Sequence, residues 1–409
     1  MLESLKPYLT VRNAIYFFSF IAGWPCVFYL LGWLPNYQIN YIVLFGICFI
    51  FTILIGGEAI PSKMRNILYV QIFCWVFYSM IHQDTSYFTR ILYLLITYML
   101  LKMQYNDDNE NNFVKIYDGW ISLQAVCGTI GLILVTIGIL TPLGFFTEMD
   151  GRRGYFFGLF TTNVYFGGLV RNAGFFDEPG AMACWGIYAL LLNKLFVKNK
   201  VIEYALIIGL ISTLSMAYYI QLAGYLLLFY RKRTWKLILI VVTIYMASRV
   251  IASYNTELSN AIFGRFEYNE STGKLAGDNR SDLVDTCWKI FCDYPIFGMG
   301  ARALASSETA QTYGFVGANF FTGWAADGLI GAFVSYLPLI MIFQMGRFDK
   351  KYYGVGLILL IGFLQRPYDS AQLLFPLLTY SILLHGYMSE SSIEDEDNLL
   401  ESAPDNVSL

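Results

Sequence analysis

The sequence predicts an all-α polytopic membrane protein, and two observations support this class. The chain has 409 residues, of which 56% are hydrophobic and only 14% are charged, whereas soluble domains carry about 25% charged residues. Many apolar runs approach or exceed about 17 residues, which is the lower end of the length that a membrane helix needs. One soluble core could not bury so many runs, and helices satisfy their own backbone groups in lipid.

Apolar runs define about twelve expected spans. They lie near residues 14–34, 38–55, 66–82, 87–103, 119–141, 180–197, 201–215, 216–230, 236–253, 318–345, 353–367 and 370–388. The first span is expected to act as its own insertion signal, because the residues before it are polar and no cleavable signal is visible. No internal repeat or linker is evident, so residues 1–388 are expected to form one domain.

Short basic loops set the expected orientation. Lys6 and Arg12 precede the first span, and further Lys and Arg residues occur at 62–65, 197–200, 231–233 and 346–351. Because basic residues in short loops face the cytoplasm, both termini are expected to be cytoplasmic. The long loops 142–179 and 254–317 then face outward. The acidic residues 389–409 are expected to form a disordered cytoplasmic tail.

The stretch 201–230 is expected to be a hairpin of two short helices. The basic segments before and after it must share one side, so an even number of crossings separates them. Each half is only about 22 Å long at 1.5 Å per residue, which is short of a hydrocarbon core of about 30 Å. The chain should turn near Ser212–Ala217, below the outer surface, and leave a hollow open to water. One long tilted helix is the alternative.

The outer loops hold many arginines for the translocated side of a membrane protein. The residues concerned are Arg152, Arg153, Arg171, Arg280 and Arg302, followed in the last outer turn by Arg366 and Tyr368. A guanidinium matches phosphate oxygens with two parallel hydrogen bonds and stays charged, so the group predicts a site for a polyanion such as a diphosphate. The alternative pairs each arginine with a loop acid or a lipid headgroup.

The stretch "VRNAGFFDEPGAMACWG" (170–186) places charge between two apolar runs. Pro179 suits the first position of a helix, which makes Glu178 the N-cap residue. Glutamate is not a preferred cap, and Ala181 cannot complete a capping box, so the cap explains the proline better than the acid. The functional interpretation makes Glu178 or Asp177 a general base or an orienting group for a sugar hydroxyl, with Arg171 binding phosphate.

Histidine and cysteine usage argues against a metal centre. The chain has two histidines and seven scattered cysteines, and none of them shows metal-ligand spacing. We therefore expect no metal and no cofactor. Residues 279–293 have apolar residues at helical spacing, which predicts an amphipathic helix over the outer face.

Three short stretches resemble the O-antigen ligase and polymerase superfamily. "RNAGFFDEPGAMA" (171–183) resembles the Arg–x–x–Gly–Phe–x–x–Glu–Pro stretch of O-antigen polymerases of the Wzy type, and "DYPIFGMGARAL" (293–304) resembles a Pro–Leu–Phe–Gly–x–Gly stretch. "ANFFTGWAADGLIGAF" (318–333) resembles a segment with His–Asn and Glu–x–Gly–x–x–Gly. Ala318 stands where the ligases have histidine, which favours a polymerase, and Asp327 replaces the usual glutamate. Met216 stands where a Ser–Arg pair is often found, which suggests a phosphate grip through Arg366.

The resemblance implies a GT-C-like glycosyltransferase of the bacterial inner membrane that needs no metal. Its substrates would be oligosaccharides linked to undecaprenyl diphosphate, and a hydroxyl of the incoming repeat unit would displace the diphosphate from the growing glycan. Arg171, Arg280 and Arg302 are expected to bind the diphosphate, with Glu178 as the base. Asp177, Asn319, Asp327 and Arg366 are the next candidates. No nucleic-acid partner is expected, and binding of a chain-length regulator stays open.

Two rival functions remain at this point. A transporter or flippase for an anionic glycolipid would place charges near the middle of the bilayer, whereas here charge gathers at the outer ends. A ligase would transfer finished polymer to a lipid core. Tyr155, Phe156, Phe157 and Trp324 suit stacking on sugars or, alternatively, an ordinary aromatic belt.

Overall fold

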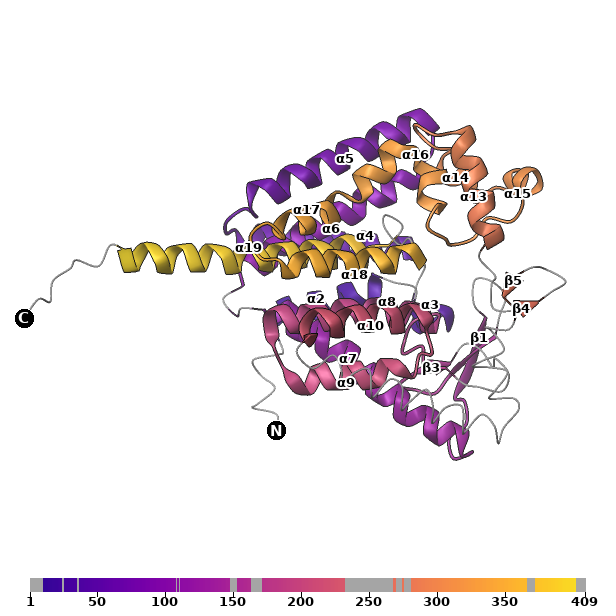
Figure 1. Ribbon diagram of the computed structural model, residues 1–409, viewed down its shortest axis with the longest axis horizontal. Coiled ribbons are helices and arrows are strands. Elements are labelled where there is room, and N and C mark those ends of the chain that lie inside the picture. The colour runs from indigo at the N-terminus through magenta and orange to yellow at the C-terminus, as the bar shows by residue number, and fades with distance from the viewer. Residues whose placement is uncertain are drawn as a thin grey trace, which may run out of the picture.

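The computed structural model describes residues 10–23, 26–34, 37–107, 109, 111–147, 153–162, 171–231, 268–269, 274–275, 281–365 and 372–401. Most of these residues are helical, and the long helices run in roughly one common direction (Figure 1). Two short antiparallel sheets and several short helices lie beyond the bundle.

The elements follow the chain in this order. The helices are α2 (Val11–Ala22), α3 (Val27–Leu30), α4 (Tyr37–Ile55), α5 (Ser62–His82), α6 (Ser86–Tyr105), α7 (Asn112–Thr136), α8 (Pro179–Leu192), the π-helix η2 (Asn193–Val197), α9 (Lys200–Ile211), α10 (Met216–Phe229), α13 (Ser281–Asp293), α14 (Ala301–Leu304), α15 (Ser307–Tyr313), α16 (Thr322–Ser335), α17 (Leu337–Met345), α18 (Lys351–Gln365) and α19 (Leu374–Glu401). The strands are β1 (Gly144–Thr147), β2 (Arg153–Phe156), β3 (Thr161–Thr162), β4 (Tyr268–Asn269) and β5 (Lys274–Leu275).

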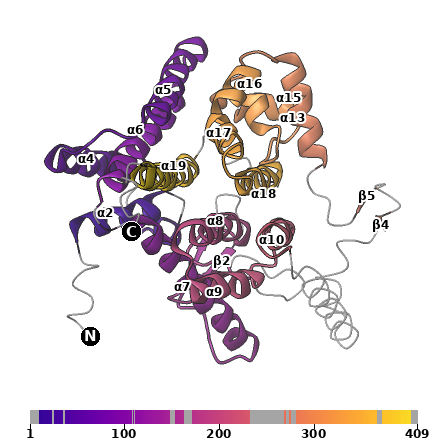
Figure 2. The same ribbon diagram turned by 60° about the vertical axis from the view of Figure 1, so that its left-hand side comes forward.

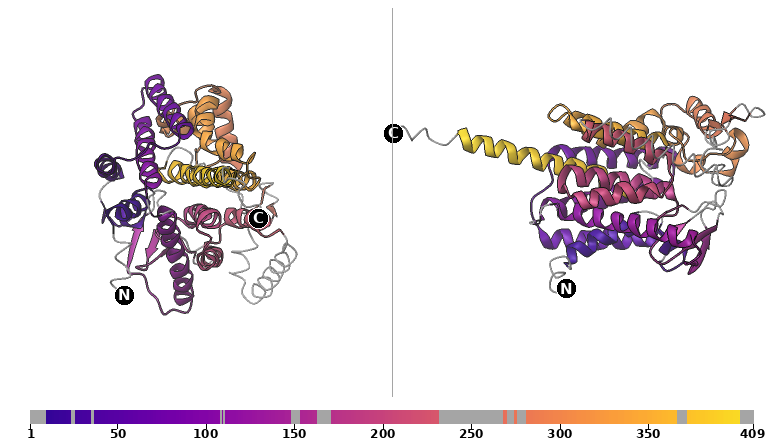
Figure 3. Two further views of the ribbon diagram at one scale, coloured as in Figure 1. Left: turned by 90° about the vertical axis from the view of Figure 1, so that its left-hand side faces the viewer. Right: turned by 60° about the horizontal axis from the view of Figure 1, so that its bottom comes forward.

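The two ends of the bundle differ. Strands β1–β3 and helices α13–α15 lie at one end, which we call the loop end, and α19 extends beyond the bundle at the opposite end, which we call the tail end (Figures 1 and 3). At the tail end, Arg12 of α2 forms an ion pair with Asp107, which follows α6, at 2.7 Å. At the loop end, residues 293–302 contact the turn between α5 and α6.

Within the described ranges, four helical stretches are long and apolar enough to cross a membrane: Ser62–His82, Asn112–Val135, Pro179–Val197 and Thr322–Met345. Shorter apolar helices lie at Val11–Ala22, Ile39–Ile55, Met216–Phe229 and Lys351–Phe363. Several helices expose large apolar side chains, such as Leu54 (76%), Phe73 (74%) and Met80 (65%), which suits contact with lipid. The fold is therefore compatible with an all-α membrane protein, and the count of about twelve spans stays a prediction.

The helices form two groups joined by α2 and by the last two helices. Helices α7–α10 pack together on one side, and α4–α6 pack together on the other, where α16 contacts α5 and is followed by α17 (Figure 2). Helix α2 contacts both α4 and α7. Helix α18 contacts both α10 and α17, while α19 contacts α6 and α17. Helix α19 also contacts the first group, because the hydroxyl oxygen of Tyr188 on α8 lies 3.1 Å from Thr379 Oγ1 on α19. The core consequently runs continuously through both groups.

The first expected span, 14–34, is wrong as one continuous helix. Helix α2 ends at Ala22, with Gly23 as its C-cap, and Pro25 follows in the sequence. Proline lacks a backbone N–H and clashes with the preceding helical turn, so the chain leaves the helix here. After the break, the Val27 N–H donates to the carbonyl oxygen of Phe175 at 2.8 Å. Residues 26–34 therefore belong to the loop end.

The first outer loop contains structure that the apolar periodicity did not predict. Strand β2 pairs antiparallel with both β1 and β3. Phe146, Phe156 and Phe175 are buried together with Val27 in a small aromatic core. Aromatic residues favour strands, and this core fixes the sheet against the first helix group.

The acidic end of the chain differs from the prediction of a disordered tail from residue 389. Helix α19 continues to Glu401 and protrudes from the tail end (Figure 3). Glutamate and leucine are good helix formers, and a helix that is already nucleated adds further residues at low cost. The amphipathic helix expected at 279–293 is confirmed as α13. The span expected at 236–253 lies outside the described residues.

Candidate functional site

The turn between α9 and α10 is recessed below the loop end of α7. Thr129 of α7 lies level with it, because its Oγ1 is 3.1 Å from the carbonyl oxygen of Gly209 and 3.1 Å from Ser212 Oγ. From Thr129, α7 continues to Thr136, about 10 Å further along the helix axis. The predicted turn at Ser212–Ala217 is confirmed, since α9 ends at Ile211 and α10 begins at Met216.

Arg171 binds this recessed turn. Its Nε donates to the carbonyl oxygen of Thr213 at 2.9 Å, and its Nη2 donates to that of Leu214 at 3.2 Å. These carbonyls follow the C-terminus of α9, where the helix dipole favours a cation. The two bonds fix the plane of a half-buried guanidinium at the bottom of the recess.

Asn172 supports the same contact from the next position. Its backbone N–H donates to the carbonyl oxygen of Ser212 at 3.1 Å, and its Nδ2 donates to Ser212 Oγ at 3.1 Å. Its Oδ1 accepts from the Gly174 N–H at 2.8 Å. Asn172 is fully buried, so each of these polar groups needs the partner that it has. The segment that carries Arg171 is therefore held rigidly.

Asp177 and Glu178 stand at the start of α8, close in sequence to this segment. Pro179 is the first residue of α8 and Glu178 is its N-cap, as predicted. The Glu178 carbonyl oxygen accepts from the Ala181 N–H at 3.1 Å, but its side chain makes no capping hydrogen bond. Both acids are half-buried. We call Arg171, Asp177, Glu178 and the turn 212–215 the hairpin site.

Arg153 lies apart from the hairpin site, on β2. Its guanidinium carbon lies 4.3 Å from the centroid of the Phe145 ring, which is a cation–π arrangement on an exposed strand. Arg152, Arg280, Arg366 and Tyr368 lie outside the described residues.

Arg302 belongs to the second helix group. Its backbone N–H donates to Asp84 Oδ2 at 2.9 Å, and its side chain is exposed on α14. Burial of Asp84 opposes ionisation, but hydrogen bonds from Ser86 and from the Arg302 N–H, with the charge of Arg302, outweigh it and lower the pKa of this carboxyl. Asp84 thus anchors the start of α14 as a carboxylate.

Asp327 is buried in an ion pair. Its Oδ2 accepts from Arg90 Nη1 at 2.6 Å and its Oδ1 from the Tyr87 hydroxyl at 3.0 Å. Its backbone carbonyl oxygen accepts from the Tyr78 hydroxyl at 2.6 Å. The side chain of Asp327 is 1% exposed and that of Arg90 is 12% exposed. We call Arg90, Asp327, Tyr78 and Tyr87 the clamp.

Asn319 also has a well-defined set of partners. Its Nδ2 lies within hydrogen-bonding distance of the Leu283 carbonyl oxygen at 3.0 Å and of Cys287 Sγ at 3.1 Å. Its Oδ1 accepts from the Phe321 N–H at 2.8 Å. Asn319 therefore joins α13 to the turn that leads into α16, and at 1% exposure its side chain is closed to solvent.

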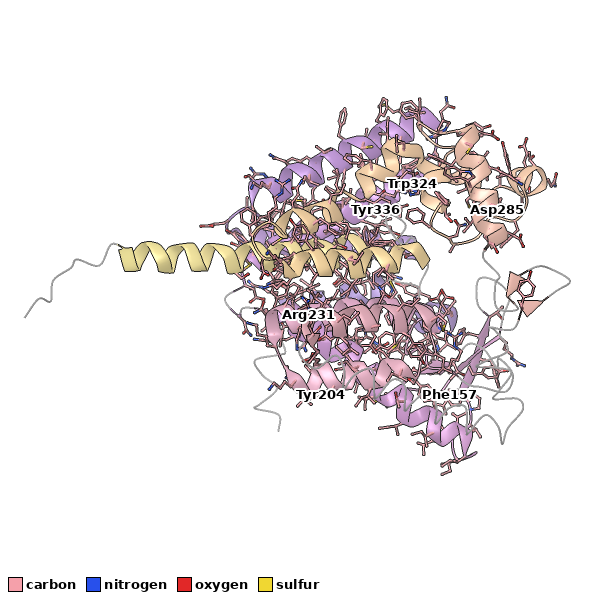
Figure 4. The ribbon with its side chains drawn as sticks, viewed as in Figure 1. Phe157, Tyr204, Arg231, Asp285, Trp324 and Tyr336 are labelled. Carbon is pink, nitrogen blue, oxygen red and sulfur yellow. The ribbon has the colours of Figure 1, made fainter. Side chains whose placement is uncertain are left out.

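The described candidates consequently fall into three places. Arg171, Asp177 and Glu178 lie in the segment that leads into α8, Arg302, Asn319 and Asp327 lie with α13–α16 in the other group, and Arg153 lies on β2. Figure 4 shows this separation at the loop end, with Phe157 beside the first group and Trp324 in the second, whereas Arg231 and Tyr204 lie toward the tail end.

Sequence reasoning missed Arg90, Tyr87 and Asp84. A signal was present for Arg90, because an ionisable residue inside an expected span, here 87–103, marks a function or a buried partner. Nothing in the spacing identifies Asp327 as that partner, since the two residues are far apart in the sequence.

Two small cavities lie in the described parts of the chain. One of about 10 Å³ lies beside Gln71, Trp75, Arg90 and Ser335, and another of about 10 Å³ lies beside Cys26, Trp120 and Phe175. Each has room for about one water molecule, and the residues of the hairpin site line neither. The predicted hollow stays a prediction. Among the described residues, no group of three or more His, Cys, Asp or Glu side chains is placed to hold a metal ion.

No model of a known protein family matches the chain, and no curated protein matches it either.

Proposed function

We propose that the chain is a membrane glycosyltransferase that polymerises lipid-linked oligosaccharide repeat units. The growing glycan passes from undecaprenyl diphosphate to a hydroxyl of the incoming undecaprenyl-diphosphate-linked repeat unit. The observation that carries the proposal is the hairpin site, where a guanidinium fixed by two carbonyls lies in one short segment with two carboxylic acids. Polar groups at one end of an apolar bundle suit the headgroup of a lipid substrate.

The proposal includes an orientation in the bacterial inner membrane, with about twelve spans and both termini in the cytoplasm. Lys194, Lys198 and Lys200 lie around the end of α8 and the start of α9, at the tail end, and Arg231 follows α10 there (Figure 4). Basic residues in short connections favour the cytoplasmic side, so the tail end is assigned to the cytoplasm and the loop end to the periplasm.

In the proposed reaction the hydroxyl oxygen of the repeat unit attacks the anomeric carbon of the growing glycan. The bond from that carbon to the diphosphate oxygen breaks, and undecaprenyl diphosphate leaves with the electron pair. Glu178, or Asp177 beside it, accepts the proton of the hydroxyl as a general base. Arg171 stabilises the negative charge that develops on the diphosphate.

The geometry of Arg171 suits this role because its orientation is set before substrate binds. The Thr213 and Leu214 carbonyls hold the planar fork, so less conformational freedom is lost when a phosphate oxygen approaches. Charge placement also favours a glycosyltransferase over a transporter. Arg90 lies four residues after the start of α6, at the loop end, and Lys194 lies at the tail end, so these buried ionic side chains stay near the ends of the bundle.

Replacement of Arg171 by Lys tests the proposal. A single ammonium cannot bind both carbonyls with a planar fork, so we expect at least about a tenfold loss of chain extension. The measurement is the length distribution of lipid-linked polymer in cells, with the amount of folded protein in the membrane as a second readout. Arg347→Lys is the matched control, because Arg347 is exposed beyond α17 at the tail end.

The products distinguish the candidate functions. A polymerase defect leaves single repeat units that still reach the lipid core. A ligase defect accumulates long polymer on the carrier lipid, and a flippase defect abolishes the outward-facing intermediate. Either of the last two results, or full-length polymer in a correctly folded Arg171→Lys variant, would reject the proposed function.

A further inference from the structure

The backbone of α16 is broken beside Asp327. Gly328 has φ 64° and ψ −167°, which no helical residue adopts, so the hydrogen-bond ladder is interrupted there. A broken helix in a membrane protein must satisfy its freed backbone groups from elsewhere in the protein.

Residues 295–300 supply those partners. The N–H groups of Met299 and Gly300 donate to the carbonyl oxygens of Ala325 and Ala326 at 2.9 and 2.8 Å. In return, the N–H groups of Leu329 and Ile330 donate to the carbonyl oxygens of Pro295 and Ile296 at 2.8 and 3.2 Å. The loop segment therefore occupies the break and is bonded to both of its sides.

The approach of the two backbones is close enough to need glycine. A Cβ atom on Gly298 would lie 2.3 Å from the Ala326 carbonyl oxygen, and one on Gly328 would lie 2.4 Å from the Gly298 nitrogen. Both glycines also have positive φ, at 72° and 64°. Gly298 of the "FGMG" stretch and Gly328 of the "DG" pair therefore lie on the two sides of one close backbone contact.

The turn between α5 and α6 and the residues beside it bind the same loop segment and the start of α14. His82 Nε2 lies 3.0 Å from the carbonyl oxygen of Phe297, and the Tyr87 hydroxyl accepts from the Ala301 N–H at 3.2 Å. Asp84 accepts from the Arg302 N–H. Tyr87 also donates to Asp327, so a single side chain links Asp327 to the start of α14.

Arg90 packs against two aromatic rings while it binds Asp327. Its guanidinium carbon lies 4.6 Å from the Trp75 ring centroid and 4.8 Å from that of Tyr87, while Nη1 binds Asp327. The cation is therefore enclosed by two aromatic faces and one carboxylate, which leaves it one preferred position.

We infer that Arg90 and Asp327 are positioning residues. Their ion pair fixes the break in α16, the break holds residues 295–300, and these residues hold α14 so that Arg302 is presented at one place on the loop end. The inference rests on the proposed function in one respect: it takes Arg302 to act on the diphosphate. Asp327 itself acts through the loop segment and touches no substrate.

Two native cysteines report the state of the clamp. Cys287 is fully buried between α13 and α16 in a cluster with Ile290, Leu304 and Ala325, whereas Cys292 on the same helix is exposed. Loss of the clamp should release α14 and expose Cys287, while Cys292 serves as an internal reference.

The first experiment labels membrane vesicles with a membrane-impermeant maleimide and follows each cysteine by peptide mass spectrometry. Asp327→Asn should raise the labelling rate of Cys287 relative to Cys292 by at least about tenfold. The matched control is Glu203→Gln, which breaks the buried Lys194–Glu203 pair at the tail end, where Nζ and Oε1 are 2.8 Å apart. Continued protection of Cys287 in Asp327→Asn, or equal exposure in Glu203→Gln, would overturn the clamp.

The second experiment combines Asp327→Asn with Arg302→Ala and measures chain extension. Because Asp327 acts through Arg302, the double variant should be no worse than the stronger single variant. If the losses of chain extension in the two single variants multiply in the double variant, Asp327 acts independently of Arg302, which would overturn the positioning role. Normal chain extension in Arg302→Ala would show that Arg302 does not act on the diphosphate. This result is independent of the cysteine labelling, which tests the clamp, and of the Arg171→Lys variant, which tests the proposed function.

Discussion

The hairpin site and the clamp both gather charge at the loop end, but they use it differently. In the clamp, a carboxylate and a guanidinium satisfy each other, with side-chain exposures of 1% and 12%. In the hairpin site, the guanidinium is held by backbone carbonyls, and the adjacent acid at the start of α8 does not cap its helix. The first arrangement fixes structure, whereas the second places a guanidinium in one short segment with two carboxylic acids.

Removing one charge from the clamp should have the largest effect on stability. Asp327→Asn leaves Arg90 buried without its counter-ion, and we expect the free energy of unfolding to fall by about 3–5 kcal/mol. The measurement is equilibrium unfolding in mixed detergent micelles. Replacing both partners, Arg90→Met with Asp327→Leu, should recover much of this loss. If Asp327→Asn were as stable as the wild type, the clamp would not stabilise the fold and would not differ from the hairpin site in this respect.

Removing a charge from the hairpin site should affect activity and leave the fold intact. Because glutamine has nearly the same size and shape as glutamate and Glu178 makes no capping bond, Glu178→Gln should keep the fold and insert normally into the membrane. Loss of a general base should slow chain extension by about a hundredfold or more. The readout is the polymer length distribution, with Asp177→Asn as the matched variant. Long polymer from Glu178→Gln would exclude an essential role for that residue.

A smaller effect is expected on acidification, through Asp84. Its folded pKa is lowered, so the carboxylate contributes stability above its ordinary pKa of about 4 and loses it as the pH falls through the folded value. Thermal stability of the wild type should therefore decline below about pH 4 more steeply than that of Asp84→Asn. Parallel pH profiles for the two proteins would show that Asp84 is not held as a carboxylate.

The smallest effect is expected at the tail end. Deleting the residues after about 390 removes the part of α19 that extends beyond the bundle, at the opposite end from both regions (Figure 1). Chain extension and membrane insertion should stay at wild-type levels. An inactive truncated protein would assign a function to the acidic helix.

Long apolar runs predicted the helices well, since burial or contact with lipid leaves few alternatives for them. The turn of the hairpin followed from the parity of basic loops and from the length of its two halves. Three features escaped prediction because they depend on contacts between distant segments: the β1–β3 sheet, the break in α16 and the partner of Arg90. The Arg171–Pro179 stretch was found because charge and proline interrupt an apolar sequence, but its contact with Thr213 and Leu214 required coordinates.

The break in α16 has a consequence for biogenesis. Residues 295–300 form the hydrogen bonds that α16 lacks at its break, and this segment is itself bound by His82 at the turn between α5 and α6. In a nascent chain entering lipid, the halves of α16 cannot complete their backbone pairing until that earlier segment has folded back over α5 and α6. Assembly of this half of the protein is therefore ordered, with α5 and α6 serving as the template on which the later span is finished.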